Sequence, residues 1–211
     1  AINVYSFQAQ EGDYILMPFA KVGIGDFCPY VAIYDEEGNK IREKSATSTA
    51  SISHRFSRTG RYTIVIHDTG YTNTGSYSFT IQRLNNPGGA EELTVGESEG
   101  EISSRAQIHS FILTGQRDDE VSFEVARITG YRDFSPYLCI YDESGRRVAD
   151  TNSSDSFIMQ AERYFVYVYD DDFADTGTYR MSFIGPPPRI SGVTINIEDG
   201  AKFYRGDMVE I

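Results

Sequence analysis

An internal repeat constrains the fold of this 211-residue chain more than any other feature of its sequence. Segments roughly one hundred residues apart match in the same order along the chain. The matching pairs are Ser6-Phe7 with Ser110-Phe111, Pro29-Tyr30 with Pro136-Tyr137, Ile33-Tyr34-Asp35-Glu36 with Ile140-Tyr141-Asp142-Glu143, Arg61-Tyr62 with Arg163-Tyr164, and Thr74-Gly75-Ser76-Tyr77 with Thr176-Gly177-Thr178-Tyr179. Because the separation between matches changes by only a few residues, we expect the two copies to share their regular elements and to differ in their loops.

The shared segments alternate apolar and polar residues, which is the period of a β-strand with one buried face. The composition agrees, with fifteen Tyr, thirteen Phe, nineteen Gly and no Trp, since aromatic residues favour strands and Gly favours turns. The sequence therefore predicts an all-β chain of antiparallel sheets packed as sandwiches. The apolar series are Tyr62, Ile64 and Ile66, then Tyr77, Phe79 and Ile81, and in the second copy Tyr164, Val166 and Val168, then Tyr179, Met181 and Phe183.

The repeat and the turn residues together predict the domain organisation. We expect a first sandwich at residues 1–84, a linker at 85–89, a second sandwich at 90–185 and a C-terminal extension at 186–211. The extension is a Pro-rich spacer followed by two alternating strands, too short to bury a core of its own. A leading pair of short strands in the second copy has no counterpart before Phe7, so the first sandwich is expected to lack its opening strands.

Each copy also carries an acidic turn between two predicted strands. The turns are Asp35-Glu36-Glu37-Gly38-Asn39 and Asp142-Glu143-Ser144-Gly145-Arg146. Gly supplies the positive φ that a tight hairpin needs, and Asp forms hydrogen bonds to the nearby backbone. These acidic residues are therefore predicted to form turns.

The net charge of −12 and the pI of about 4.6 exclude some classes of partner. Such a surface repels phosphate backbones and anionic lipids, which argues against binding to nucleic acid or to a membrane surface. No apolar run approaches the length of a membrane span, and no signal peptide is present. Because the chain begins at Ala1, we expect a processed mature chain or an excised fragment, and the missing signal does not argue against export.

The sequence offers little to a catalytic mechanism. Cys28 and Cys139 fall at non-equivalent places in different halves, so we expect two buried free thiols, with a bridge between the halves as the alternative. No Gly-x-Ser-x-Gly, His-Glu-x-x-His or phosphate-binding glycine loop occurs. We therefore expect that the chain is not an enzyme.

The histidines also point away from catalysis. His67 is predicted to lie on the strand face opposite Tyr62, and Tyr169 replaces it in the second copy. His109 matches Tyr5. A histidine that exchanges with tyrosine between copies indicates a surface or aromatic-packing position.

The best candidate for a ligand site is the acidic loop at residues 170–175. Asp170, Asp172 and Asp175 place three carboxylates on one short loop, and hard oxygen ligands of this kind suit calcium. The matching loop of the first copy keeps only Asp68, and the spacing is not that of an EF-hand. A calcium site is one hypothesis and a solvated acidic turn is the other, and no cofactor is required. Asn152, in Asn152-Ser153-Ser154, is a candidate glycosylation site.

Taken together, these patterns resemble the bacterial and archaeal pre-peptidase C-terminal (PPC) domain family over nearly all of both repeats. The resemblance implies jelly-roll or CUB-like β-sandwiches appended to secreted enzymes, adhesins and surface proteins, and some collagenase members bind calcium and collagen. The tail at 186–211 resembles the first two strands of an Ig-like domain. The residues that carry the resemblance are Leu93 and Gly96 of a Leu-x-x-Gly opening, Phe7 and Phe111, the Ile-Tyr-Asp-x-x-Gly strand and turn, and the closing Thr-Gly-x-Tyr.

Two functions are expected from these features. The first is a non-catalytic binding or spacer module of a larger secreted or cell-surface protein, extracellular or at the cell surface, with a protein or polysaccharide ligand. The second is a subunit of a surface filament or layer, in which a strand of the 186–211 tail completes the open sheet edge of another copy. The simpler explanation of the two ends is that each belongs to a neighbouring domain.

Overall fold

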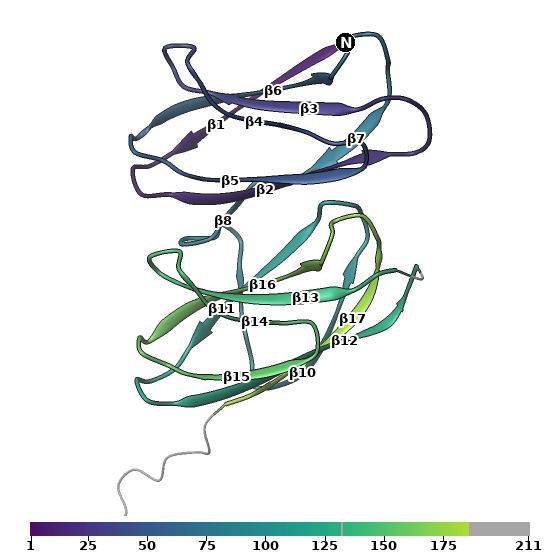
Figure 1. The fold of residues 1–211 in the computed structure, drawn as a ribbon. Helices are drawn as coiled ribbons and strands as arrows, with labels where there is room; N and C mark the ends of the chain where they lie inside the picture. The colour runs from purple at the N-terminus through teal and green to yellow at the C-terminus, as the bar shows by residue number, and fades with distance from the viewer. Residues whose placement is uncertain (132, 186–211) are drawn as a thin grey trace, which may run out of the picture.

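The computed structural model describes residues 1–131 and 133–185. Every regular element in this part of the chain is a β-strand, and the strands form four sheets. The sheets lie over one another in four layers, with the first sandwich above the second in Figure 1. The predicted all-β class with β-sandwiches in tandem is therefore confirmed. The predicted two-stranded extension at 186–211 lies outside the described residues.

The first sandwich consists of sheet A, with strand order β1-β6-β3-β4, and sheet B, with order β5-β2-β7 and β8 also paired to β2. The N–H of Thr80 donates a hydrogen bond to the carbonyl of Pro18 at 3.2 Å. Pro18 has no N–H with which to form the second bond of the pair, and the strand beside β2 is divided here into β7 and β8. The strands are β1 (Ile2–Ala9), β2 (Tyr14–Val22), β3 (Pro29–Tyr34), β4 (Lys40–Ser45), β5 (Thr49–Arg55), β6 (Gly60–Asp68), β7 (Ser76–Phe79) and β8 (Gln82–Arg83).

The second sandwich consists of sheet C, with strand order β14-β13-β16-β11-β9, and sheet D, with order β10-β17-β12-β15. All of its strand pairs are antiparallel apart from the parallel pair of β9 with β11. The strands are β9 (Glu91–Glu92), β10 (Gly96–Ile102), β11 (Ile108–Thr114), β12 (Glu120–Gly130), β13 (Pro136–Asp142), β14 (Arg147–Thr151), β15 (Ser154–Ile158), β16 (Arg163–Asp170) and β17 (Gly177–Ile184).

Strand pairing shows how the two copies correspond, and it corrects one match made from sequence. Phe7 pairs with Tyr62, and Leu113 pairs with the matching Tyr164. Phe7 therefore corresponds to Leu113, two residues beyond the Phe111 with which sequence alone aligns it. Alternation cannot reveal this error, because a shift of two residues leaves every side chain on its own face of the sheet.

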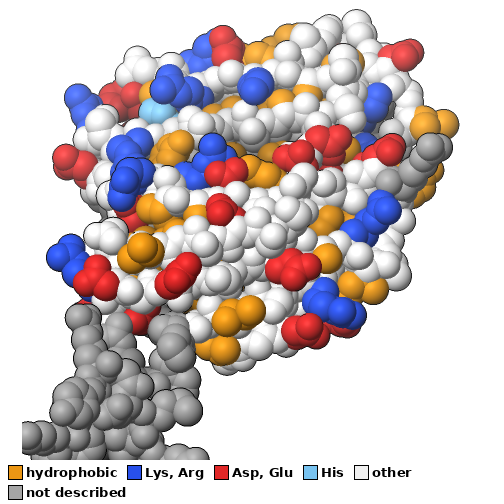
Figure 2. All heavy atoms as spheres, turned by 60° about the horizontal axis from the view of Figure 1, so that its bottom comes forward, with side chains coloured by type: hydrophobic (Ala, Val, Ile, Leu, Met, Phe, Trp, Pro, Cys, Tyr) orange, Lys and Arg blue, Asp and Glu red, His pale blue; other side chains and the backbone are white. Residues whose placement is uncertain are grey.

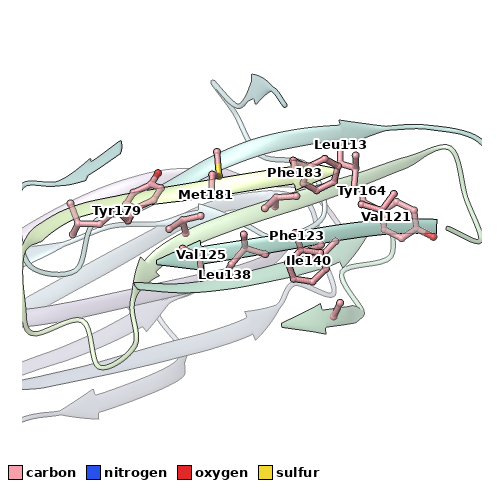
Figure 3. Close-up of a cluster of buried hydrophobic side chains, with 14 of the residues drawn as sticks. Leu113, Val121, Phe123, Val125, Leu138, Ile140, Tyr164, Tyr179, Met181 and Phe183 are labelled. Carbon is pink, nitrogen blue, oxygen red and sulfur yellow. The ribbon is translucent and has the colours of Figure 1, made fainter. Parts of the chain in front are cut away.

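Each sandwich encloses an apolar core. In the second, side chains from both sheets converge as Figure 3 shows, and the alternating residues predicted to be buried lie in it. In the first, the predicted residues of β6 are buried and those of the closing strand pack against the core. The buried core residues include Ile15, Met17, Phe19, Val31, Ile33, Ile52, Phe56, Tyr62, Ile64 and Ile66 in the first sandwich, and Leu113, Val121, Phe123, Val125, Leu138, Ile140, Tyr164, Val166, Val168, Tyr179, Met181 and Phe183 in the second.

The first sandwich is open on one side where the second is closed. In the second sandwich β10 pairs with β17 and β9 pairs with β11, and Ile102 and Leu93 pack on the core beside them. Within residues 1–131 and 133–185, β1 and β7 have no such partners and are edge strands. The closing-strand side chains are consequently buried in the second sandwich and half-buried in the first. The two matching sets are Tyr179, Met181 and Phe183, and Tyr77, Phe79 and Ile81.

The two sandwiches pack on each other through a third apolar cluster, which lies between sheets B and C and which we call the interface cluster. Large apolar side chains of β16 and β13 meet residues of β2 and the segment after β8. Strand β16 is thus buried on both faces, one toward its own core and one toward the first sandwich. The buried members are Leu84, Ile108, Cys139, Phe165, Tyr167 and Tyr169, with Tyr14, Leu16, Ile112, Tyr137, Tyr141 and Phe173 packed against them.

Directional contacts cross the same interface. Gly145 in the turn between β13 and β14 approaches Tyr14 so closely that a Cβ there would lie 3.0 Å from the Tyr14 ring. Hydrogen bonds to backbone carbonyls fix the orientation of the two sandwiches in addition to the apolar contact. They run from the Tyr167 hydroxyl to Arg83 O at 2.7 Å, from Arg105 Nη1 to Lys21 O at 2.8 Å, and from Arg55 Nη2 to Ser144 O at 2.6 Å.

Two further observations concern the surface and the length of the elements. On the face that Figure 2 turns forward, acidic and basic side chains are interspersed with small apolar patches. In the part of the chain that the structure describes, no helix has the length and apolar character needed to cross a membrane.

Candidate metal centre

The loop after β16 brings the three predicted metal ligands together. Carboxylate oxygens of Asp170, Asp172 and Asp175 all lie within 4.8 Å of one another. Asp170 ends β16 and is buried, Asp172 is exposed, and Asp175 is half-buried. The three residues form one acidic cluster that reaches solvent through Asp172.

Asp170 is held in place by backbone donors from two segments. Its Oδ1 accepts a hydrogen bond from the N–H of Ser135 at 2.9 Å. Its Oδ2 accepts hydrogen bonds from the N–H groups of Ala174 and Asp175 at 3.0 and 2.9 Å. Asp170 therefore ties the loop to the segment before β13 and satisfies backbone groups that a turn leaves unpaired.

The electrostatics of the cluster disfavour its own negative charge. Burial, and after it the neighbouring carboxyl of Asp172, raises the pKa of Asp170 to about 6. Burial, and after it Asp172, also raises the pKa of Asp175. A divalent cation would relieve this repulsion and lower both pKa values, so the arrangement can accept a hard cation such as calcium.

The first sandwich keeps the structural aspartate without the cluster. Asp68 ends β6 and accepts backbone hydrogen bonds at the matching place. The hydrogen bond from the backbone of Cys28, ahead of those from the loop, lowers the pKa of Asp68, which is the opposite direction to Asp170. Closing the loop thus needs one aspartate, and Asp172 and Asp175 are additional. The donors to Asp68 are the N–H groups of Cys28 at 2.9 Å and of Gly70, Thr72 and Asn73 at 3.2 Å each.

The two acidic turns bear out the prediction that their aspartates serve the backbone. Asp35 Oδ1 accepts a hydrogen bond from the N–H of Asn39 at 2.7 Å, and Asp142 Oδ1 accepts one from the N–H of Arg146 at 2.9 Å. The glycines of these turns have φ values of 81° and 76°, which other residues rarely adopt.

His67 lies on the outer face of sheet A, opposite the core, as predicted. Its ring stacks with those of Tyr30 and Tyr71 at centroid distances of 4.6 and 4.2 Å. The Nε2 atom lies 3.1 Å from the hydroxyl of Tyr71, and Nδ1 lies 2.7 Å from the carbonyl of Asp68. His67 therefore belongs to an aromatic stack.

His109 contacts the hydroxyl of Tyr179 through Nδ1 at 2.8 Å. Its predicted match with Tyr5 is wrong in register by the same two residues as the rest of that strand. Tyr5 nevertheless meets the matching hydroxyl, that of Tyr77, at 2.8 Å. Burial lowers the pKa of His109, which favours a neutral, hydrogen-bonded imidazole at pH 7.

Both cysteines are free thiols, which decides between the two alternatives that the sequence left. Cys28 is half-buried rather than buried. Cys139 is buried in the interface cluster, where its Sγ lies 3.1 Å from the hydroxyl of Tyr169. Burial raises the pKa of Cys139 to about 11, so the thiol is protonated and unreactive near neutral pH.

Asn152 lies in the connection between β14 and β15, and its side chain is exposed. The N–H of Ser153 is bonded to Thr151 Oγ1 at 3.0 Å, and its carbonyl accepts from the N–H of Val125 at 2.8 Å. The sequon therefore stands on an ordered turn where a glycosylating enzyme could reach it.

The predictions from sequence do not include the interface cluster, although the sequence carries a signal for it. Strand β16 reads Tyr164-Phe165-Val166-Tyr167-Val168-Tyr169, which is apolar on both faces. The matching β6 reads Tyr62-Thr63-Ile64-Val65-Ile66-His67, with polar residues at two of the three positions on its outer face. A continuous apolar run indicates a strand that is covered on both sides.

Comparison with known proteins does not assign a family. No protein-family model matches the chain, and no curated protein matches it. Among solved structures, two variants of Bacillus subtilis oxalate decarboxylase align at 8% and 9% identity with TM-scores of 0.16 and 0.14, each over 86% of this chain and 68% of the other. Scores this low carry no argument about fold or activity.

Proposed function

We propose that the chain is a non-catalytic binding or spacer module of a larger secreted or cell-surface protein. The observation that carries this proposal is the interface cluster, in which residues such as Leu84 and Tyr167 are buried between the sandwiches. Domains joined by a short linker move relative to each other unless a large apolar interface holds them. A spacer has to keep the distance between its ends, and this interface supports that role.

The surface and the loops support the same proposal. A net charge of −12 favours a protein or polysaccharide partner over nucleic acid. The exposed sequon at Asn152 suits a location outside the cytoplasm. The resemblance to PPC domains points to the same setting, and a calcium ion at Asp170, Asp172 and Asp175 would stiffen one end of the second sandwich.

Rigid stacking can be tested by NMR relaxation on the full chain. If the proposal is right, amides of sheets B and C report one common rotational correlation time. Tyr14→Asp, which removes a large apolar side chain of the interface and places a charge there, should give each sandwich its own shorter time. Tyr71→Asp, at an exposed site beside sheet A and away from the interface, should leave the common correlation time unchanged. Two separate correlation times in the unmodified chain would contradict the spacer role.

The binding role needs a separate experiment. Co-sedimentation of the full chain with insoluble cell-wall polysaccharide and with fibrillar collagen tests the two ligand classes. We expect the chain to pellet with one of them, and recovery in the supernatant with both would leave only the spacer role.

A second candidate, a filament or layer subunit, is favoured by the open side of the first sandwich. Its half-buried Tyr77, Phe79 and Ile81 lie where the second sandwich is covered by β9 and β10. An added strand with alternating apolar residues would pair with the free edge of β7 and cover this side. The sequence of the 186–211 tail alternates in that way.

Deleting residues 186–211 tests the strand-donor idea. We expect the full chain to form head-to-tail polymers at high concentration and the shortened chain to stay monomeric, as measured by analytical ultracentrifugation. Polymers that persist without the tail would remove the idea. An Ile81→Asp variant of the full chain, in which the acceptor side is charged, should also remain monomeric.

A further inference from the structure

The outer face of sheet A repeats the face by which the second sandwich holds the first. Outward residues of β1, β6 and β3 pair in three rows, and those of β11, β16 and β13 pair in three matching rows. In sheet A the rows are Ile2 with His67 and Tyr30, Val4 with Val65 and Ala32, and Ser6 with Thr63 and Tyr34. In sheet C the rows are Ile108 with Tyr169 and Tyr137, Ser110 with Tyr167 and Cys139, and Ile112 with Phe165 and Tyr141.

Both faces also carry an aromatic stack at the same corner. In sheet C, Tyr169 stacks on Phe173 at 4.8 Å and meets Tyr137 in a tilted arrangement at 5.8 Å, beside the interface cluster. In sheet A, the stack of Tyr30, His67 and Tyr71 takes its place. Tyr71 and Phe173 both have positive φ, at 59° and 61°, so both copies hold an aromatic ring at this corner with a backbone conformation that non-glycine residues rarely adopt.

The two faces differ in what covers them. Sheet B covers the outer face of sheet C, and Ile108 is 8% exposed there. Sheet A is the top layer in Figure 1, and no described element lies over it. Ile2 is 58%, Val4 63% and Tyr71 68% exposed. Apolar and aromatic side chains gathered on one sheet face mark an interaction surface.

We propose that the outer face of sheet A docks a further β-sandwich of the same repeat type, packed on it as sheet B packs on sheet C. This inference rests on the proposed spacer function and extends it, because it makes the stack continue in one direction. The occupant is recognised by its chemistry. Its facing strand carries two large apolar residues, as β2 does with Tyr14 and Leu16. Thr63 and Val65 are smaller than the Phe165 and Tyr167 that they match. The docked sandwich therefore needs larger side chains over Thr63 and Val65 to fill the space.

A second copy of this chain does not fit that description. Its sheet B is already covered by its own second sandwich, which leaves sheet D as the matching face over which no described element lies. On sheet D the positions of Tyr14 and Leu16 are taken by Glu120 and Ser122, as the pairing of β2 with β5 and of β12 with β15 shows. Packing sheet D on sheet A would put a carboxylate and a hydroxyl where sheet B supplies the apolar contacts of Tyr14 and Leu16.

A three-sandwich chain tests the proposal. Residues 1–107 are joined to residues 2–211, so that Gln107 of the leading part is followed by Ile2 of the trailing part. Ile2 then takes the place that Ile108 has after Gln107 in the 211-residue chain. The leading sandwich can then lie over sheet A of the trailing one. Val65→Cys in the trailing part, with Cys28→Ser in both parts, reports whether the centre of the face is covered. Its rate of reaction with a maleimide is compared with the rate for the same substitutions in the 211-residue chain.

We expect labelling at position 65 to slow by about tenfold or more, as for a group exposed only on local opening. Leu16→Asp in the leading sandwich should restore fast labelling. Ile102→Asp in the leading part, which disturbs the added opening strands and not the stacking face, should not. Ile24→Cys, at a position that is fully exposed in the unmodified chain, serves as a control that should label at the same rate in both chains.

Other outcomes would overturn the proposal. An unchanged rate at position 65 beside a folded leading sandwich, seen by hydrogen exchange, would do so. An unfolded leading sandwich would also overturn the proposal. The leading sandwich has the sequence of the first sandwich, which folds against sheet C in the 211-residue chain, so it should fold against sheet A if the two faces are equivalent. Self-association of the 211-residue chain that Val65→Arg abolishes would assign the face to a second copy. Failure of the spacer function is distinguishable, because it appears as independent motion of the two sandwiches in the 211-residue chain itself.

Discussion

Replacing Leu84 with Ala measures how strongly the interface cluster holds the sandwiches together. Leu84 is 2% exposed and belongs to the interface cluster rather than to either sandwich core. Removing its outer carbons forfeits about 0.8 kcal/mol for each buried CH₂ group, or ~2.4 kcal/mol for three. Core Leu→Ala changes cost about 2–5 kcal/mol, and because the sandwiches can close partly over the void we expect about 2–3 kcal/mol.

The assay is urea unfolding followed by tyrosine fluorescence, with hydrogen exchange and mass spectrometry to locate the change. We expect one transition for the unmodified chain and two for Leu84→Ala, with the open first sandwich unfolding at the lower urea concentration. Leu113→Ala, in the second core, should lose a similar free energy and should not increase exchange at the interface. A change of less than about 0.5 kcal/mol for Leu84→Ala, with a single transition retained, would refute the reasoning.

Four further predictions concern the loops and the second sandwich. Calcium at a hundred times its dissociation constant should stabilise the chain by about 2.7 kcal/mol at pH 7 and should have no effect on Asp172→Asn, as measured by melting temperature; equal melting with calcium and with chelator would leave the cluster an acidic turn. Because the pKa of Asp170 is raised to about 6, the folded chain holds a proton that the unfolded chain releases between about pH 4 and 6, so ionisation of this group lowers stability as the pH rises through that window. Asp172→Asn should weaken that loss, and identical melting profiles against pH for both chains would contradict the assignment. Gly100→Ala would place a Cβ 2.5 Å from the buried tyrosine ring beneath it and should cost about 1–3 kcal/mol, while Gly88→Ala, which meets nothing within 4 Å, should be near neutral in the same denaturation assay. Cys139 should resist thiol reagents in the folded chain while the half-buried thiol of the first sandwich reacts, and modification of both at equal rates would show that the interface opens readily.

Much of the fold could be predicted from short-range patterns. The alternation of Tyr62, Ile64 and Ile66 indicates a strand with one buried face, and that face lies in the core. The aspartates at 35 and 142 indicate turns because their bonds span only a few residues. Such features depend on neighbours in the sequence, which is why the sequence alone reveals them.

Register and ligand geometry were harder to predict. The pairing of Phe7 with Tyr62 depends on a partner strand far away in sequence, and a two-residue shift leaves the apolar pattern unchanged. The sequence names Asp170, Asp172 and Asp175 as one set, but the buried, backbone-bonded state of Asp170 follows from Ser135, which lies outside the loop. Its raised pKa therefore has a tertiary cause.

The sequence by itself determined that there are two copies of one strand pattern, and which face of each strand points into its own core. Only the tertiary structure decided what happens to the other face. Tyr137 and Tyr30 occupy matching positions, yet the sheet around Tyr137 is covered by a neighbouring sandwich, whereas no element among the described residues covers the sheet around Tyr30. The physical reason is that an inward side chain is buried by its own sandwich, whereas an outward one is buried only by whatever packs against it.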